Sequence, residues 1–429
     1  MKKKYRIILY TSIFLLCVVA SIILVVKKSN SVYEEESKPK VVKHKSMLSM
    51  NLEQTAGSGD YKTVTQSSWP TEGYKFNAEL SKCENGSTLS WDDTKKAVIV
   101  SGNLSDKCYV YFDIYQPTLA EYIKSQYTGT QGENNIYYHD SDLANGAGDN
   151  SYRYAGANPN NFVCFGTTES PCPIDNLYRI IGVFGENYHG ANGKQLVKLI
   201  KYDYMTTDEL GTDGDYSQTY KEWGMDSTYK GTYGDGERIG VYYWNYKATG
   251  SATNTWSTSL LNKTNLNTNF INNIGTTWAN KIATVTWKVG GNTYANIRDA
   301  VPATTYQNEI VNPVTTNTTD NATTYSAKIG LMYVSDYGFA ASPDAWTLTM
   351  SSYNNTTATN NNWMYMGLYE WTISRNADGS SSAFRVNYDG YVYNDRVSSN
   401  YGVRASFNLE SSVSYVSGSG SMSDPIVIN

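Results

Sequence analysis

The sequence lacks the short motifs on which most enzyme classes depend. It contains no Gly-x-Ser-x-Gly, no His-Glu-x-x-His and neither a P-loop nor a dinucleotide-binding glycine pattern. Histidine occurs only three times, and His189 is the only one after Ser151. Because histidine is the most frequent general acid and base, this scarcity predicts that the protein is not an enzyme.

Positive charge and phenylalanine are also in short supply. Of the 35 basic residues six lie within residues 1–28, so the rest of the chain, with all 40 acidic residues, has a formal charge of −11. That sign disfavours non-specific binding to nucleic acid. Only 10 aromatic residues are Phe, whereas 38 are Tyr and 10 are Trp. Most rings therefore carry a polar group, which suits half-exposed binding surfaces.

One long hydrophobic run stands out from this polar sequence. Residues 7–26 are uncharged and mostly apolar, and a helix of that length spans roughly the 30 Å hydrocarbon core of a bilayer. Residues 1–6 carry more basic side chains than residues 27–28, so the positive-inside rule keeps the N-terminus in the cytoplasm. We expect a single-pass membrane anchor with the remaining chain outside the cell. A cleaved signal peptide is the alternative.

The other four cysteines fall into two local pairs. Cys83 precedes Cys108, and Cys164 precedes Cys172. Neither pair has the spacing of a zinc site, and no histidine accompanies them. We therefore expect disulfide bonds and an oxidising compartment, although four cysteines allow other pairings.

Composition divides the outer part into three segments. Residues 29–65 are polar and show no lasting periodicity, which is typical of a stalk or linker. Residues 66–115 contain four strand-like runs separated by turn residues, and predict a small β module for which a disulfide staple would compensate a small core. Residues 116–429 predict a larger second domain of mixed helices and strands, so the expected fold class is α+β.

Several elements of the second domain can be placed from periodicity. Residues 117–125 have helical spacing of apolar side chains behind a Pro-Thr start, and residues 257–275 show an incomplete amphipathic helix. The runs 176–184 and 195–201 predict a hairpin. Strands are also expected within 282–289 and 327–335.

The stretch 362–409 predicts a strand, a serine-rich loop, a hairpin and a closing strand. Asp389-Gly390 suits a two-residue turn, because Gly supplies positive φ without a steric penalty, and Tyr388 would then face Tyr391. Alternation outward from that turn puts Phe384, Val386, Tyr388, Tyr391, Tyr393 and Asp395 on one face, and Arg385, Asn387, Val392, Asn394 and Arg396 on the other. The first face is expected to be core-like. The second is either solvated surface or a recognition surface.

Four sequence segments in this order carry a family resemblance: W-S-T-S-L-L-N at 256–262, I-G-L-M-Y-V-S at 329–335, W-M-Y-M-G-L-Y-E-W-T-I-S-R at 363–375 and Y-G-V-R-A-S-F-N-L at 401–409. They resemble a bacterial C-type-lectin-like domain. The family concerned comprises uncharacterised bacterial surface domains that end in a Gly-Val-Arg-Pro-type strand, and it is related in fold to formylglycine-generating enzymes and to the variable proteins of diversity-generating retroelements. Ala405 replaces the family proline here.

The resemblance implies a domain core over about residues 151–429, a lectin-like fold and a binding role. It also implies that the segment from Trp69 to Phe112 is a small disulfide module of a kind found ahead of such domains. Formylglycine-generating chemistry is disfavoured, because no cysteine follows Cys172. Arg404 is expected to anchor backbone carbonyls rather than to meet a ligand.

The candidate ligand-binding residues combine rings for stacking with amides and guanidinium groups for hydrogen bonds. They are Trp363, Arg385, Asn387, Asn394, Arg396, Asn400 and Tyr401. No cofactor is predicted. Calcium could be bound by carboxylates, with Asp395 beside Asn394, Asp336 and Asp344 as candidates, but a Glu-Pro-Asn-like signature is absent.

The resulting hypothesis is a membrane-anchored, adhesin-like extracellular protein that recognises a glycan, a cell-wall polymer or a protein. The alternatives are a structural surface component without a ligand of its own and, more remotely, an extracellular enzyme. Residues 376–401 contain only Asn, Ala, Asp, Gly, Ser, Phe, Arg, Val and Tyr. This restricted set could result from diversification of Asn codons or from drift in a chain rich in Tyr, Asn and Ser.

Overall fold

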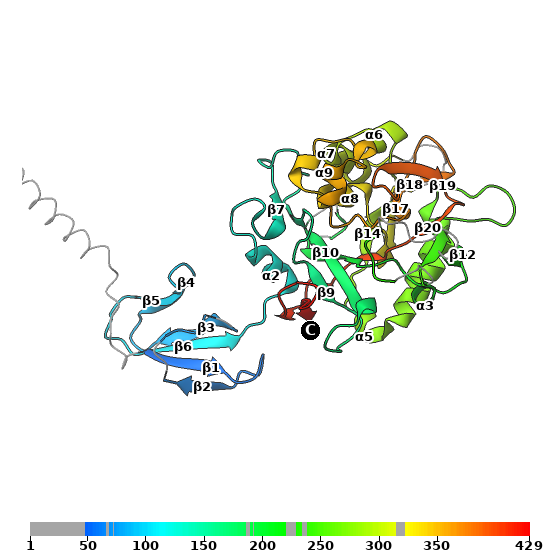
Figure 1. Cartoon of the computed structure of the whole chain (residues 1–429). Helices are drawn as coiled ribbons and strands as arrows, with labels where there is room; N and C mark the ends of the chain where they lie inside the picture. The colour runs from blue at the N-terminus through cyan, green and yellow to red at the C-terminus, as the bar shows by residue number, and fades with distance from the viewer. Residues whose placement is uncertain are drawn as a thin grey trace, which may run out of the picture. The chain divides into compact units, whose positions relative to one another are not determined.

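The computed structural model describes residues 48–65, 68–71, 73–185, 189–191, 193–219, 229–233, 238–314 and 322–429. The chain forms two compact units that divide between Tyr115 and Gln116 (Figure 1). Both are rich in strands, and together they confirm the expected α+β class. The hydrophobic run at residues 7–26 lies outside the described residues. In the part that is described, none of the helices combines the length and the hydrophobicity needed to cross a bilayer.

The described part of the first unit, blue to cyan in Figure 1, is a four-stranded sheet with a separate hairpin. The sheet order is β2-β1-β6-β3, and β6 is parallel to β1 but antiparallel to β3. Alternation along β6 buries Cys108, Val110 and Phe112, and the ring of Phe112 meets that of Trp91 edge-on. The strands are β1 (Leu48–Glu53), β2 (Tyr61–Val64), β3 (Tyr74–Cys83), β4 (Thr88–Asp92), β5 (Ala97–Ser101) and β6 (Cys108–Ile114).

Strands β1 and β2 correct the predicted stalk. The assignment of residues 29–65 to a linker is wrong from Leu48 onward, because β1 pairs with both β2 and β6. Met50 and Leu52 are buried in the core of this unit. Leu48, Met50 and Leu52 alternate with polar residues, which is the pattern of a half-buried strand. The polar composition of the whole segment 29–65 outweighed this short pattern in the prediction.

Both expected disulfide bonds are present. Cys83 and Cys108 are direct cross-strand partners of β3 and β6. Cys164 ends β9 (Phe162–Cys164) and is bonded to Cys172 in the loop before β10 (Leu177–Phe184). These bonds indicate an oxidising, extracellular type of environment for the described chain.

The second unit contains two large sheets among its described residues. One has the order β16-β21-β11-β10-β8-β7, with β9 added to β10, and the other has the order β12-β13-β20-β17-β18-β19. Two short pairs, β14 with β15 and β22 with β23, complete the strands. The bounds not yet given are β7 (Ile136–His139), β8 (Ser151–Tyr154), β11 (Leu196–Lys201), β12 (Tyr216–Thr219), β13 (Gly240–Tyr243), β14 (Val285–Lys288), β15 (Thr324–Ala327), β16 (Ile329–Gly330), β17 (Glu370–Arg375), β18 (Ser382–Val386), β19 (Val392–Arg396), β20 (Asn400–Gly402), β21 (Ser406–Asn408), β22 (Tyr415–Ser417) and β23 (Val427–Ile428).

Short helices fill the connections of the second unit, and α6, α7, α8 and α9 group together (Figure 1). The α-helices are α2 (Leu119–Ser125), α3 (Thr207–Leu210), α4 (Ile271–Asn273), α5 (Gly275–Ala279), α6 (Tyr294–Arg298), α7 (Pro302–Tyr306), α8 (Val334–Ala340) and α9 (Thr356–Asn360). The 3-10 turns are η1 (Glu133–Asn135), η2 (Ile174–Asn176), η5 (Trp256–Thr258), η8 (Pro343–Ala345) and η9 (Met350–Ser352), and η6 (Leu261–Phe270) and η7 (Gln307–Val311) are π-helical.

Most predicted elements of this unit exist with shifted ends. Helix α2 begins at a capping box in which Thr118 and Glu121 satisfy each other's backbone N–H groups. The hairpin of β10 and β11 is present, and β14 lies within the predicted strand at 282–289. The predicted strand at 327–335 is only partly right, because β16 is short and α8 starts at Val334. Asp336 caps α8 by accepting a hydrogen bond from the Tyr333 N–H at 2.9 Å.

The closing stretch has the predicted order of elements but not the predicted register. Val386 pairs with Val392 and Arg385 pairs with Tyr393, so three residues rather than two form the turn. Gly390 occupies the positive-φ position of that turn at φ 105°. The change of one residue moves Tyr393 from the face of Phe384 to the face of Arg385. The assignment of faces on β19 was therefore wrong.

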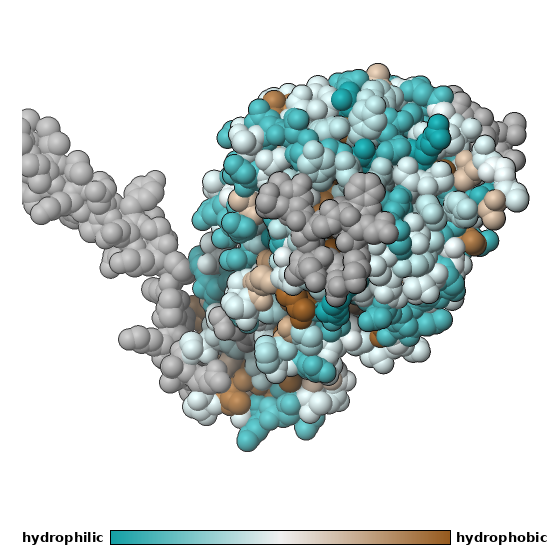
Figure 2. Space-filling view, turned by 45° about the vertical axis from the view of Figure 1, so that its right-hand side comes forward, coloured by the Kyte–Doolittle hydropathy of each residue, from teal (hydrophilic) through white to brown (hydrophobic). Residues whose placement is uncertain are grey.

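The core of the second unit lies between and beside its sheets. The residues expected to form the frame of the fold are indeed buried, namely Trp371, Phe384, Val386, Arg404, Phe407 and Leu409. On the face shown in Figure 2, hydrophobic residues are scattered singly among hydrophilic ones.

Candidate binding site

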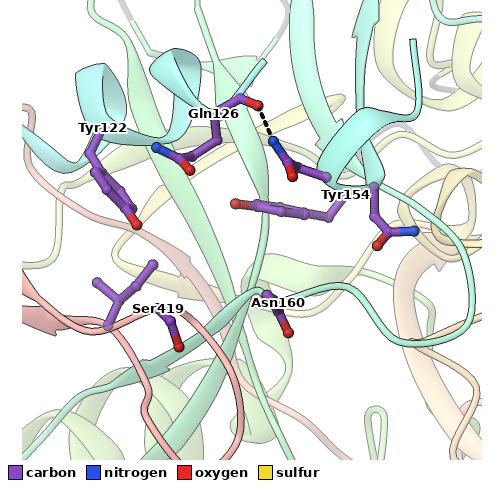
Figure 3. A pocket seen from close by; sticks show the side chains of 8 residues that line it. Tyr122, Gln126, Tyr154, Asn160 and Ser419 are labelled. Carbon is purple, nitrogen blue, oxygen red and sulfur yellow. Dashed lines mark hydrogen bonds between the residues drawn. The ribbon is translucent and has the colours of Figure 1, made fainter. Parts of the chain in front are cut away.

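A small pocket opens in the second unit where α2, η1, the start of the β8–β9 connection and the C-terminal segment meet (Figure 3). Its volume is about 200 Å³, below the roughly 300 Å³ at which pockets for drug-sized molecules begin. It is lined by Tyr122, Gln126, Asn134, Asn135, Tyr154, Asn160, Ser419 and Ile426. This set, called the amide pocket below, contains no carboxylate and no cation.

Tyr154 is the central residue of the amide pocket. Its side chain comes from the end of β8 and is only 4% exposed, while its hydroxyl points into the pocket (Figure 3). Among the described residues this hydroxyl has no hydrogen-bond partner. A buried tyrosine hydroxyl normally finds one, so the group is placed to accept or donate a hydrogen bond to something in the pocket.

One wall of the pocket is built from consecutive asparagines in the left-handed backbone region. Asn134 and Asn135 have φ values of 57° and 59°, a conformation that asparagine tolerates better than most residues. The Asn134 amide donates to the backbone carbonyl of Gln126 at 2.9 Å, which joins η1 to the end of α2 (Figure 3). The side-chain amide of Asn135 makes no hydrogen bond to a described residue, which leaves it available to a ligand.

The opposite wall brings together segments more than 250 residues apart in the chain. Gly420 lies so close to Asn160 that an added Cβ would meet the Asn160 carbonyl oxygen at 2.5 Å, and its φ of 80° also requires glycine. The Phe162 N–H donates to the Gly420 carbonyl at 2.8 Å. These contacts hold Ser419 beside Asn160, whose side-chain amide has no partner among the described residues.

The pocket is electrically neutral over the ordinary pH range. Burial, followed by the interaction with Tyr415, raises the pKa of Tyr122 to about 12, and burial raises the pKa of Tyr154 as well. Both hydroxyls therefore keep their protons and can donate. The ring of Tyr122 stacks on that of Tyr415 with centroids 3.6 Å apart, which fixes the tyrosine at the rim.

The residues singled out from the sequence lie elsewhere, on and around the β18–β19 hairpin. Arg385 and Asn387 were expected on an exposed face, and this is wrong for both, because they are 7% and 3% exposed. Arg385 donates to Asn387, which in turn donates to Asp389. Asn394 is half-buried and Arg396 is exposed, as a surface site would need.

The guanidinium of Arg385 is the centre of a tyrosine cluster. It stacks on the rings of Tyr369 and Tyr401 at 4.5 and 4.9 Å and lies 3.4 Å from the Asp395 carboxylate. Tyr401 donates to Asp395 at 2.6 Å. Burial opposes ionisation of Asp395, but this hydrogen bond and its neighbours keep its pKa below the ordinary value. Arg385 and Tyr401 thus contact other groups of the protein, although the Arg385 Nε has no hydrogen-bond partner among the described residues. Asn400 is half-buried beside them.

Trp363 and Arg404 have structural contacts. The Trp363 indole N–H donates to the Tyr154 carbonyl at 2.8 Å, so this residue, only 3% exposed, supports the amide pocket from behind. Arg404 forms a two-pronged ion pair with Glu370 and donates to the Met364 carbonyl at 2.7 Å. The expected anchoring of a backbone carbonyl by Arg404 is confirmed. Its ion pair with Glu370 was not predicted from the sequence.

Two of the three carboxylates considered for calcium have protein partners. Asp336 is paired with Lys198, and Asp395 is held by Tyr401 and Arg385. Asp344 lies in the η8 turn. Across the described residues, the structure contains no group of three or more His, Cys, Asp or Glu side chains that could hold a metal ion.

Sequence reasoning missed the amide pocket altogether. Its residues come from 122–160 and 419–426, segments that no local pattern connects. The available signal was the pair of asparagine clusters at 134–135 and 158–161, which the general abundance of asparagine obscured. Comparison of the chain with protein-family models, with curated proteins and with solved structures gave no match.

Proposed function

We propose that the chain is a membrane-anchored extracellular binding protein and that its second unit recognises a neutral, hydroxyl-rich ligand in the amide pocket. The ligand class is a terminal sugar of a glycan or of a cell-wall polymer. Residues 7–26 supply the anchor, and the lectin-like resemblance of residues 151–429 favours the same role.

The observation that carries this proposal is the Tyr154 hydroxyl. The Tyr154 ring is buried, whereas its hydroxyl opens into the pocket and has no partner among the described residues, and it is accompanied by the unpaired side-chain amides of Asn135 and Asn160. A sugar presents several hydroxyls that both donate and accept, which matches amides and tyrosine hydroxyls. The absence of charge in the lining disfavours phosphate, carboxylate or ammonium ligands.

The size of the pocket narrows the ligand further. A volume of about 200 Å³ accommodates one small ring system and not an extended chain. The rim position of Tyr122 and the exposure of Asn160 and Ser419 leave the pocket open to solvent on one side. We therefore expect recognition of the end of a polymer, with the rest of the polymer outside.

The test is a glycan and cell-wall polymer array probed with the full chain in detergent, followed by titration of any hit. Asn160→Ala is expected to weaken binding about 2- to 10-fold, the effect of one net hydrogen bond of about 0.5–1.5 kcal/mol. The matched control is Asn394→Ala on the β18–β19 hairpin, which should bind like the unmodified chain.

Two outcomes would contradict the proposal. If no neutral glycan or polymer on the array binds the chain, the alternative function, a structural surface component without a ligand, is favoured. Binding that is insensitive to Asn160→Ala but lost in the Asn394→Ala, Arg396→Ala double variant would move the site to the hairpin face, where the sequence placed it.

A further inference from the structure

The core of the second unit encloses a lysine and an aspartate in direct contact. Lys198 lies on β11, a strand buried along its whole length, and Asp336 lies on α8. The Lys198 Nζ is 2.5 Å from the Asp336 Oδ2, and the two side chains are 2% and 1% exposed. This contact joins positions 138 residues apart in the chain.

The surroundings of this pair exclude water. The Lys198 ammonium faces the rings of Tyr333, Trp287 and Phe184 at 4.4, 5.3 and 5.8 Å. The Asp336 Oδ2 also accepts the Tyr333 N–H at 2.9 Å, which fixes the carboxyl group in front of the amine. Reacting atoms held together in a dry, apolar site have a large advantage over the same groups in water.

A third buried carboxyl belongs to the same cluster. Glu309, on η7, accepts hydrogen bonds from the Ser335 N–H and the Ser374 hydroxyl, and Ser335 is the neighbour of Asp336. Burial raises the pKa of Glu309 to about 7, and burial lowers the pKa of Lys198. Burial therefore disfavours the charged forms of both Glu309 and Lys198.

From this geometry we propose that Lys198 and Asp336 condense spontaneously to an intramolecular isopeptide bond. Proton transfer from the ammonium to the carboxylate gives a neutral amine and a neutral acid. The Nζ lone pair attacks Cγ of Asp336, a C–N bond forms, a C–O bond breaks, and the departing hydroxyl takes the second amine proton and leaves as water. The ammonium and carboxylate become one amide and one water, with no change of oxidation state and no co-reactant. Glu309 acts as a positioning residue, because its carboxyl group accepts the N–H of Ser335 and so holds the backbone next to Asp336.

Burial also makes the condensation of Lys198 with Asp336 thermodynamically favourable. An ion pair in the interior carries the desolvation cost of both charges, whereas an amide carries none of it. Water released from the core joins bulk solvent. Elsewhere in the same core Arg153 pairs with Asp149 at 2.7 Å, but a guanidinium is not acylated under these conditions, so that pair stays ionic.

A second lysine of β11 provides an internal control. Lys201 is fully buried and lies 3.2 Å from Glu209, but the Glu209 side chain is 20% exposed. Water therefore reaches the Glu209 carboxylate, and Lys201 is expected to remain a free amine.

The experiment is mass spectrometry of the full chain purified in detergent, reduced and digested with trypsin. Trypsin should fail to cleave after Lys198 and should cleave after Lys201. The peptide 195–201 should be found joined to the peptide 329–375, with a mass lower than their sum by one water. On a reducing denaturing gel the linked chain should migrate faster than the Lys198→Arg variant, which keeps the positive charge but cannot form the bond.

The proposal fails if the unmodified chain yields the free peptide 195–198 and no linked species. This readout needs no variant and is therefore independent of any folding defect. Glu309→Gln should reduce the linked fraction of freshly synthesised chain several-fold, and an unchanged fraction would overturn the role given to Glu309.

Discussion

At the residue scale, removal of the Tyr154 hydroxyl is expected to weaken ligand binding without lowering the stability of the fold. Tyr154→Phe removes only a hydroxyl that has no partner among the described residues, so the folded state loses no hydrogen bond. We expect the unfolding free energy to change by less than about 0.5 kcal/mol, because the hydroxyl opens into the pocket and no hydrogen bond within the protein is lost. Affinity for the array ligand should fall about 2- to 10-fold.

The measurement pairs thermal denaturation with ligand titration on the same preparations. Tyr393→Phe, on an exposed ring of the β18–β19 hairpin, is the matched control and should change neither quantity. Lower stability with unaltered affinity in Tyr154→Phe would show that the hydroxyl serves the fold and not a ligand.

Glu309 should make stability fall with rising pH. Burial raises its pKa from an ordinary 4.5 to about 7 in the folded chain. A raised pKa contributes stability that is fully present below the unfolded value and is lost as pH rises through the folded value. Between pH 4.5 and 7 this loss amounts to about 3 kcal/mol.

Chemical denaturation across that pH range measures the effect, with Glu309→Gln as the comparison. The amide can still accept from the Ser335 N–H and cannot ionise, so the variant should lack this part of the slope. Buried His139 and His189, whose pKa values are lowered mainly by burial, act in the opposite sense in both proteins and cancel in the difference. Parallel curves for the two proteins would contradict the assignment.

At the scale of elements, the turn between β18 and β19 depends on Gly390. Its φ is 105°, and a Cβ there would meet the Thr359 Cγ2 at 2.6 Å and the Tyr353 carbonyl at 2.8 Å. Gly390→Ala should therefore lower the unfolding free energy by more than about 1 kcal/mol. Gly379→Ala, in the neighbouring loop with ordinary φ and open space, should stay within about 0.5 kcal/mol of the unmodified chain. Equal melting temperatures for the two variants would argue against the three-residue turn.

That same turn shows what the sequence could and could not predict. Period-two alternation identified the strands around it, because alternation is a property of single segments. The register was wrong by one residue, since alternation alone does not choose between a two- and a three-residue turn. The observed turn is also held from outside, by the Tyr337 hydroxyl, which donates to the Gly390 carbonyl at 2.7 Å across 53 positions. Helix α8 was missed although its cap is local, since Asp336 accepts the N–H of Tyr333 three residues earlier, but the apolar run before it is equally compatible with a strand.

The amide pocket could not be predicted at all, for a reason of the same kind. Tyr154 is ordinary in a tyrosine-rich strand, and Asn160 is ordinary in an asparagine-rich loop. Only the close approach of Gly420 to Asn160 brings Ser419 to these residues. Buried positions such as Trp371 and Phe407 were predictable, because apolar side chains in strands face a core whatever the topology.

At the scale of the whole molecule, the two units should differ in their dependence on disulfide bonds. The first unit has a small core around Met50, Leu52, Val110 and Phe112, so the Cys83–Cys108 bond is a large part of its stability. The chain-entropy relation gives about 3–4 kcal/mol for its 25-residue separation and about 2–3 kcal/mol for the 8-residue separation of Cys164 and Cys172. The second unit has far more buried apolar surface, which compensates for loss of the Cys164–Cys172 bond.

Limited proteolysis of the full chain in detergent, with and without reductant, measures this difference. Under oxidising conditions both units should resist a protease of broad specificity. After reduction the segment before Tyr115 should be degraded first, while a fragment that begins near Gln116 persists. The Cys83→Ala, Cys108→Ala double variant should show the same order of cleavage without reductant, whereas the Cys164→Ala, Cys172→Ala variant should retain both units. Simultaneous loss of both units on reduction would contradict this view, because it would mean that the second unit depends on its disulfide bond as strongly as the first unit does. Survival of both would show that the small sheet stands without its covalent link.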